Sequence, residues 1–170
     1  MVGTRTISSI EENIPSLRRY AWSLLRDKSD ADDLVQDCLV RALGHVDALR
    51  PDSDLRAWLF TIMHNIFAGR WRRMRNQARL MTEQVEADTA IPAPQQASAE
   101  MRDVLRGLDT LPEEQREVIL LIAVEGFQYD EVASMLGIPI GTVMSRLSRA
   151  RDRLSQFAQG QERPRLRRVK

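Results

Sequence analysis

The sequence predicts an all-α protein of two small helical domains, and three observations support this fold class. Leu, Ala, Arg and Glu, which favour helices, are abundant, whereas glycines and runs of β-branched residues are few. Apolar residues recur at intervals of three and four over several long segments. Residues 80–99 interrupt these segments with prolines, small residues and acids but no Lys or Arg, a composition typical of a flexible linker. We therefore expect domains at residues 8–79 and 100–158, followed by a basic tail at 159–170.

The first domain is expected to be a three- to four-helix bundle. Its first helix covers about residues 13–26, where Pro15 fits the first turn and apolar residues form one stripe. Ser29 is expected to cap the second helix, because aspartates follow it at the positive end of the helix dipole. The second helix repeats apolar residues at helical spacing, and we expect all of them to face the core: Ala31, Leu34, Val35, Cys38, Leu39, Ala42, Leu43 and Val46.

A break at residues 51–54, which ends in a capping residue, precedes a third helix at about residues 55–75. The residues expected to face inward are Leu55, Trp58, Leu59, Ile62, Ile66 and Phe67. Phe60 and Trp71 lie off this stripe, so we expect them to be exposed. The end of the helix and the residues just after it carry only basic charges, from Arg70, Arg72, Arg73, Arg75 and Arg79. Exposed rings beside arginines can bind single-stranded bases and their backbone, although core aromatics beneath a solvated basic surface explain the pattern equally well.

The second domain is expected to begin near Ser98 with a short helix at residues 101–108. Pro112 then opens another helix, which Gly126 ends. The inward-facing residues of that helix are expected to be Val118, Ile119, Leu121 and Ile122. Because each domain has only about 60–70 residues, each hydrophobic core is small.

Residues 129–154 predict a helix-turn-helix, the most informative feature of the chain. Ala133 supplies the small residue where the two helices cross, Gly137 tolerates positive φ in the turn, and Val143 anchors the second helix. Pro139 directly precedes the second helix, where its missing N–H costs nothing. The residues left facing outward are Thr142, Met144, Ser145, Ser148 and Arg149, with Arg146, Arg151 and Arg153 beside them. This face suits phosphates and base edges in a DNA major groove; a helical hairpin with a solvated basic face is the simpler, less favoured interpretation.

The second helix of the first domain also has an acidic face, formed by Asp33, Gln36 and Asp37. These residues either cap the helix and keep the protein soluble, or they form a docking surface for a basic region of another protein. The net charge of the chain is only +1, so the segregation of acidic and basic segments is more informative than the total.

Several function classes have little support in the sequence. His45 and His64 have no partners at metal-ligand spacing, and Cys38 lies on an apolar stripe, which favours an inert buried thiol. There is no glycine-rich phosphate loop and no catalytic triad signature. We also find no apolar run long enough to span a membrane and no signal-peptide core, and we therefore expect a cytoplasmic protein that is not an enzyme.

Taken together, the motifs resemble the extracytoplasmic-function (group 4) sigma factors of bacterial RNA polymerase, and most closely the EcfG type of general-stress factor. Residues 30–43, DADDLVQDCLVRAL, resemble region 2.2 of that family. Residues 54–73, DLRAWLFTIMHNIFAGRWRR, resemble regions 2.3 and 2.4, and residues 111–154 resemble region 4. The three motifs occur in the order and spacing of the family.

The resemblance implies roles for particular residues. Asp33, Gln36 and Asp37 match the surface that binds the clamp helices of the polymerase β′ subunit, although Asp37 replaces a longer glutamate. Asn65 matches the residue that helps hold a flipped base of the −10 non-template strand, and residues 47–54 match the loop that accepts such a base. The residues that match the rest of the strand-capturing surface are Trp58, Arg70, Arg72 and Arg73.

In the second domain the resemblance assigns the −35 duplex to Thr142, Met144, Ser145, Arg146, Ser148 and Arg149. Met144 stands where relatives often carry Arg, which removes a bidentate donor to one base pair. The implied partners are core RNA polymerase, through its β′ clamp helices and β flap, promoter DNA, and an anti-sigma factor that clamps the two domains together. The family needs no cofactor or metal.

Two alternatives remain open. A sigma-like decoy would only sequester an anti-sigma factor and would not need the arginines at 70–75 or an intact recognition helix. A stand-alone helix-turn-helix regulator would have no use for the acidic face at 30–37.

Overall fold

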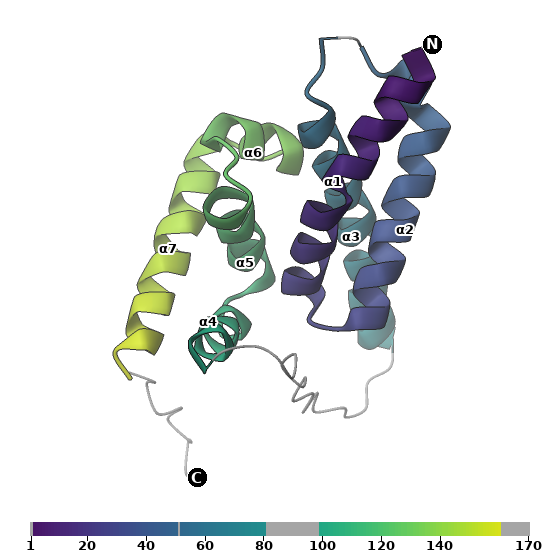
Figure 1. Ribbon diagram of the computed structural model, residues 1–170. Helices are drawn as coiled ribbons and strands as arrows, with labels where there is room; N and C mark the ends of the chain where they lie inside the picture. Colours follow the sequence, from purple (N-terminus) through teal and green to yellow (C-terminus); the bar gives the residue numbers. More distant parts are fainter. Residues whose placement is uncertain (1, 51, 81–98, 161–170) are drawn as a thin grey trace.

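The computed structural model describes residues 2–50, 52–80 and 99–160, and the side chains of residues 8–47, 49–50, 52–70, 73 and 100–160. The elements of the first domain are α1 (Val2–Leu25), α2 (Lys28–His45), the short helix η1 (Val46–Ala48) and α3 (Leu55–Leu80). Those of the second are α4 (Ala99–Asp109), α5 (Glu113–Ile119), the π-helical turn η2 (Leu120–Val124), α6 (Tyr129–Leu136) and α7 (Ile140–Ala158). The described residues contain no strand, so the predicted all-α class is confirmed (Figure 1). Residues 81–98 of the predicted linker and 161–170 of the predicted tail lie outside this description.

Helix α1 is longer than the sequence predicted. It begins at Val2, so Pro15 lies inside the helix and not in its first turn. Ile10, one of the additional helical residues, is only 3% exposed, and its burial favours extension of the helix toward the N-terminus. Pro15 and Glu11, whose carbonyl loses its hydrogen-bond partner, are both exposed, so that carbonyl lies on the solvent side.

The cap of α2 also differs from the prediction. The Asp27 side chain, not Ser29, accepts a hydrogen bond from the backbone N–H of Asp30 at 2.8 Å. The preceding residue, Arg26, adopts the left-handed conformation with φ of 61° and ends α1. Because only these two residues connect α1 and α2, the cap must lie at Asp27.

Helix α3 begins as predicted, but its aromatic pattern was misassigned. Asp54 caps the helix by accepting from the backbone N–H groups of Arg56 and Ala57 at 2.8 and 3.2 Å. The prediction that Phe60 is exposed is wrong, since the side chain is 1% exposed. Its ring meets Tyr20 of α1 and Phe127 of the second domain, with centroids 5.2 and 5.0 Å away. On α2, Leu43 was expected in the core but is 50% exposed.

The helix-turn-helix forms where the sequence placed it. Gly137 ends α6 with φ of 63°, and the N–H of Ile138 donates to the carbonyl of Ala133 at 3.1 Å. Helix α7 begins after Pro139, whose carbonyl accepts from the N–H of Thr142 at 2.8 Å. Its buried side consists of Val143, Leu147 and Ala150. Gly126, with φ of 76°, lies between η2 and α6, close to the predicted end of the preceding helix.

The two domains pack directly against each other. Figure 1 shows α5 and α6 beside the first domain, with α7 on the far side of the second. Contacts join α6 to α3, and both α5 and η2 to α1. The buried apolar residues form one continuous cluster across the domains, in which Phe60 and Phe127 meet. The sequence had indicated two modules and a linker, with no sign of this interface.

Candidate nucleic-acid interface

The outer face of α7 presents the residues predicted to contact duplex DNA. Met144 is 52% exposed, Ser148 and Arg149 are also exposed, and Thr142 and Ser145 are half-buried. The buried stripe on the opposite side of α7 fixes this orientation, because residues one helical turn apart share a face. The Ser145 hydroxyl donates to the Thr142 carbonyl at 3.0 Å. Arg149 therefore projects from a rigid helix and can reach phosphates or base edges.

Arg146 is positioned differently from Arg149. Its guanidinium pairs with the Glu114 carboxylate of α5 at 2.7 Å, and its side chain is only 20% exposed. This ion pair ties α7 to α5 within the second domain. Arg146 thus supports the position of α7 against α5, and its guanidinium is less available to another molecule than that of the exposed Arg149.

The acidic face of α2 is exposed as predicted. Asp33, Gln36 and Asp37 all lie on the solvent side, while Leu34 and Cys38 face the core. Asp37 pairs with Arg70 of α3, which joins a predicted polymerase-binding residue to a predicted DNA-binding one. Burial raises the pKa of the Cys38 thiol to about 12, so the thiol stays protonated and unreactive.

A cavity of about 340 Å³ lies between the last turns of α2 and the first half of α3. Its lining combines two predicted residues with three others: Trp58, Asn65, Arg41, His45 and Ile62. His45 Nδ1 lies 2.9 Å from the Arg41 carbonyl, which leaves Nε2 available to another group. A cavity with an aromatic ring, an exposed amide and two basic side chains can accept one unstacked base.

Sequence reasoning missed Arg41 and His45 in this cavity. They lie four residues apart, which places them on one face of α2, and that spacing was the available signal. This face of α2 lines a cavity only because α3 packs beside it. The loop at 47–54 begins two residues after His45, but its Pro51 lies outside the described residues.

The predicted basic surface of α3 is only partly described. Arg73 is exposed and Arg70 is half-buried beside Asp37, away from the cavity that contains Asn65. The side chains of Arg72 and Trp71 are outside the description. The structure therefore joins Trp58 and Asn65 in one site but does not bring Arg70 into it.

Two other kinds of feature are absent from the part of the chain that the structure describes. No group of His, Cys, Asp and Glu side chains suitable for a metal ion occurs there. None of the described helices is both long and apolar enough to cross a membrane.

Comparisons with known proteins identify the family. Residues 10–64 match the family described as Sigma2 domain of PhyR, and residues 101–154 match Sigma-70, region 4. The chain is also 39% identical over 142 residues to the ECF RNA polymerase sigma factor EcfG of Rhodopseudomonas palustris (strain TIE-1), covering 84% of this chain and 78% of that relative. The chain belongs to the extracytoplasmic-function sigma factors. Its function is accordingly that of an RNA polymerase sigma factor.

Solved structures support the same assignment for this sigma factor. The sigma factor RpoE of Bartonella quintana, in complex with the anti-sigma factor NepR, matches with a TM-score of 0.79 and 36% identity over 89% of this chain and 95% of that chain. CnrH, in complex with the cytosolic domain of CnrY, matches with a TM-score of 0.65 and 30% identity over 91% of this chain and 88% of that chain. The predicted family is thus confirmed, and the predicted roles of individual residues stay predictions.

Proposed function

We propose that this sigma factor reads a −35 element as closed duplex through α7 and holds a −10 base through the cavity at Asn65. The observation that carries this proposal is the presence of two different surfaces in one chain. The outer face of α7 is a rigid helix with exposed Arg149, suited to a major groove. The Asn65 cavity is a recess with an aromatic wall, suited to a base that has left the stack.

Trp58, Arg70, Arg72 and Arg73 complete the proposed strand-binding surface. Trp58 supplies the ring of the Asn65 cavity. Arg70 and Arg73 lie outside this cavity, and the proposed role of the three arginines is to contact the strand backbone beyond the held base. Arg41 and His45 join this set because they line the same cavity. The duplex-reading set consists of Thr142, Met144, Ser145, Arg146, Ser148 and Arg149.

The acidic face of α2 is proposed to bind core polymerase in the cytoplasm. Asp33, Gln36 and Asp37 are exposed beside Val40 and Leu43, which are 64% and 50% exposed. Acidic groups around exposed apolar side chains suit a basic, partly apolar protein surface. This arrangement also accounts for Leu43, which the sequence had placed in the core.

An anti-sigma factor is proposed as a further partner. The similar structures of RpoE and CnrH were both solved with partner proteins, NepR and the cytosolic domain of CnrY. In this chain a groove of about 410 Å³ is lined by both domains, including Leu34 and Phe67 from the first and Arg116 from the second. A partner that fills such a groove would bind only the closed arrangement of domains.

The test of the proposal is run-off transcription with purified core polymerase and candidate promoters. The wild-type chain should direct initiation, and Asn65→Ala should reduce open-complex formation while −35 duplex binding stays unchanged. Glu12→Ala, an exposed change on α1 outside the cavity, is the control. Failure of the wild-type chain to direct initiation, with polymerase shown to be active, would overturn the proposal. Equal loss of duplex binding by Asn65→Ala would refute the division of duties.

A decoy function is the second candidate, because residues 10–64 match the family described as Sigma2 domain of PhyR. A decoy would bind an anti-sigma factor without binding polymerase. The exposed Arg149 on an intact α7 favours the sigma factor. The transcription assay separates the two candidates, since a decoy gives no transcript at any promoter.

A further inference from the structure

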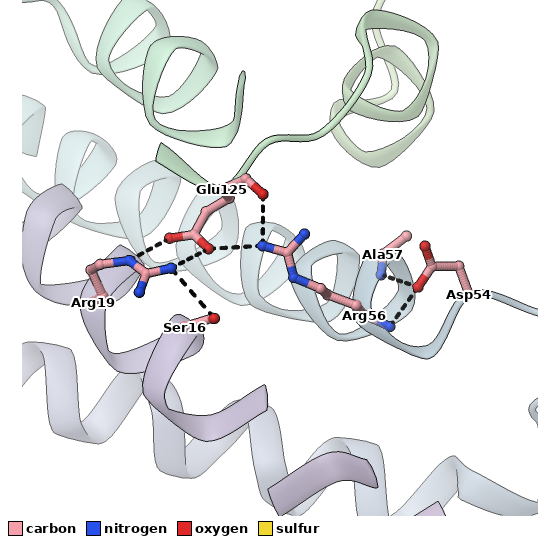
Figure 2. Close-up of polar contacts among 6 residues, drawn as sticks. All are labelled: Ser16, Arg19, Asp54, Arg56, Ala57 and Glu125. Carbon is pink, nitrogen blue, oxygen red and sulfur yellow. Dashed lines mark hydrogen bonds and ion pairs between the residues drawn. The ribbon is translucent and has the colours of Figure 1, made fainter. Parts of the chain in front are cut away.

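The interface between the domains contains carboxylates of the second domain bound by groups of the first. The Glu125 side chain, which follows η2, has no exposed surface. Arg19 of α1 donates to both carboxylate oxygens, at 3.0 and 2.8 Å, in a bidentate pair. Arg56 of α3 donates to the same carboxylate at 2.9 Å and to the Glu125 carbonyl at 2.8 Å. Figure 2 shows Glu125 between these two arginines, which come from different helices.

Both arginines are held in position by their surroundings. The cap of α3 places Arg56 in its first turn, because Asp54 accepts the Arg56 backbone N–H. The Arg56 guanidinium then lies 4.3 Å from the centre of the Phe127 ring, a favourable cation–π contact with the second domain. The guanidinium of Arg19 also donates to the Ser16 hydroxyl at 3.4 Å (Figure 2).

In the further contacts across the interface, the second domain again supplies the carboxylate and the first domain the group that binds it. Glu117 of α5 receives the Tyr20 hydroxyl at 3.3 Å and lies 2.6 Å from His64 Nδ1. Burial, and next the charge of Glu117, raise the pKa of Tyr20, so its hydroxyl remains a donor. Arg26, which follows α1, donates to Asp109 at 3.1 Å. In all these pairs the acid belongs to the second domain.

We propose that Arg19, Arg56 and Glu125 form a latch that holds the sigma factor in a closed state unable to engage a promoter. This inference rests on the proposed function, because it requires that the two domains bind the −10 and −35 elements. Release of the Glu125 latch, defined by these three residues, would then precede promoter binding and control its extent.

The spacing of the two elements argues that the closed state is inactive. The centres of elements at −10 and −35 lie about 25 base pairs apart, or about 85 Å along the duplex. A compact chain of 170 residues is only about 40 Å across. The domains in Figure 1 are packed side by side, so they must separate before both elements can be bound.

The two domains can separate and close again because the Glu125 latch consists of ion pairs. A buried ion pair loses water from both partners, and this loss offsets much of the attraction. When the domains separate, Glu125 and both arginines regain water. Removal of the arginines instead leaves Glu125 buried without its partners, which disfavours only the closed state. The Nη1 atom of Arg26, buried with no hydrogen-bond partner among the described residues, adds a further cost of closure.

The first experiment measures the shape of the full chain by small-angle X-ray scattering. The wild-type chain should have a radius of gyration of about 16 Å, the value for a compact chain of this length. Arg19→Ala combined with Arg56→Ala should raise it above about 20 Å, as expected for two domains on a linker. Glu125→Gln should act in the same direction, because it removes the shared charge. Arg18→Ala, an exposed neighbour on α1, is the matched control and should remain compact.

The second experiment measures transcription by core polymerase without any anti-sigma factor, at limiting sigma concentration. The latch variants should give about fivefold or more transcript, because a larger fraction of the protein is competent to bind. Helix content by circular dichroism shows whether each variant is folded. If the double variant is unfolded, Glu125→Gln takes its place in both experiments. Compact latch variants, or variants with wild-type transcript levels, would overturn the latch. A wild-type chain that gives no transcript would overturn the proposed function instead, and scattering would still test the closure.

Discussion

The second domain carries charge on two faces, and the faces differ in how that charge is held. On the outer face of α7, Arg149 is exposed to water. On the inner face, formed by α5 and η2, the carboxylates of Glu117 and Glu125 are 7% and 0% exposed and are bound by the first domain. The outer charges are available to a partner, whereas the inner charges already have partners. The comparison shows that one small domain can expose cations to water on one face while its carboxylates bind a neighbouring domain on another.

The largest predicted effect lies in the first domain, where it covers the second domain at Phe127. Phe60→Ala should lower the free energy of unfolding by about 3–5 kcal/mol, because it removes a fully buried ring between Tyr20 and Phe127. Urea unfolding followed by circular dichroism measures this change. Met144→Ala on the outer face should stay within about 0.5 kcal/mol of wild type. Equal effects of the two changes would show that the faces do not differ as described.

The next effect lies on the outer face. Arg149→Ala should weaken binding to −35 duplex by about 1–3 kcal/mol, measured by fluorescence anisotropy, if the arginine reads a base edge. Arg102→Ala, an exposed change on α4 in the same domain, is the control and should leave binding unchanged. A loss of the same size on a scrambled duplex would assign Arg149 to phosphate and remove its role in specificity.

The stability of the protein should also be sensitive to substitution in the turn that precedes α7. Gly137→Ala should cost about 1–2 kcal/mol of stability, because φ of 63° strains a residue with Cβ, although no atom lies within 4 Å of that Cβ. Gly44→Ala, in α2 and equally free of close contacts, should instead stabilise the protein by about 0.5–1 kcal/mol. Thermal unfolding distinguishes the two. A neutral Gly137→Ala would contradict the assigned backbone strain.

The smallest effect concerns the ion pair that links the two faces within the domain. Because the Glu114 side chain is 70% exposed, its pair with Arg146 should contribute only about 0.2–1 kcal/mol. A double-mutant cycle with Arg146→Ala and Glu114→Ala, measured by urea unfolding, gives this coupling free energy. A coupling above about 2 kcal/mol would mean that Arg146 is held too firmly to exchange its partner for DNA.

The local features of the fold were predictable because they depend on neighbouring residues. The helix-turn-helix followed from Gly137 and Pro139, which act through their own backbone conformations. The exposed acidic face of α2 followed from helical spacing alone. Errors arose where local alternatives were close, as at the cap of α2, where Asp27 and Ser29 are both suitable residues.

Only half of the candidate site was predictable, because the other half depends on how two helices pack together. Asn65 and Trp58 were expected from their motif, but Arg41 and His45 joined them only through the packing of α2 on α3. Phe60 was placed at the surface because its stripe was judged against the first domain alone. Its actual neighbour, Phe127, is 67 positions away in the chain.

The sequence by itself determined the all-α class, the order of the helices and the charge of each face, since these properties follow from composition and from spacing within single helices. Only the tertiary structure decided that the domains pack together and that Glu125 is buried between Arg19 and Arg56. An acid on a polar surface and an acid in an ion pair are identical in sequence. The difference lies in which distant surface covers the residue, and that depends on the packing of the whole chain.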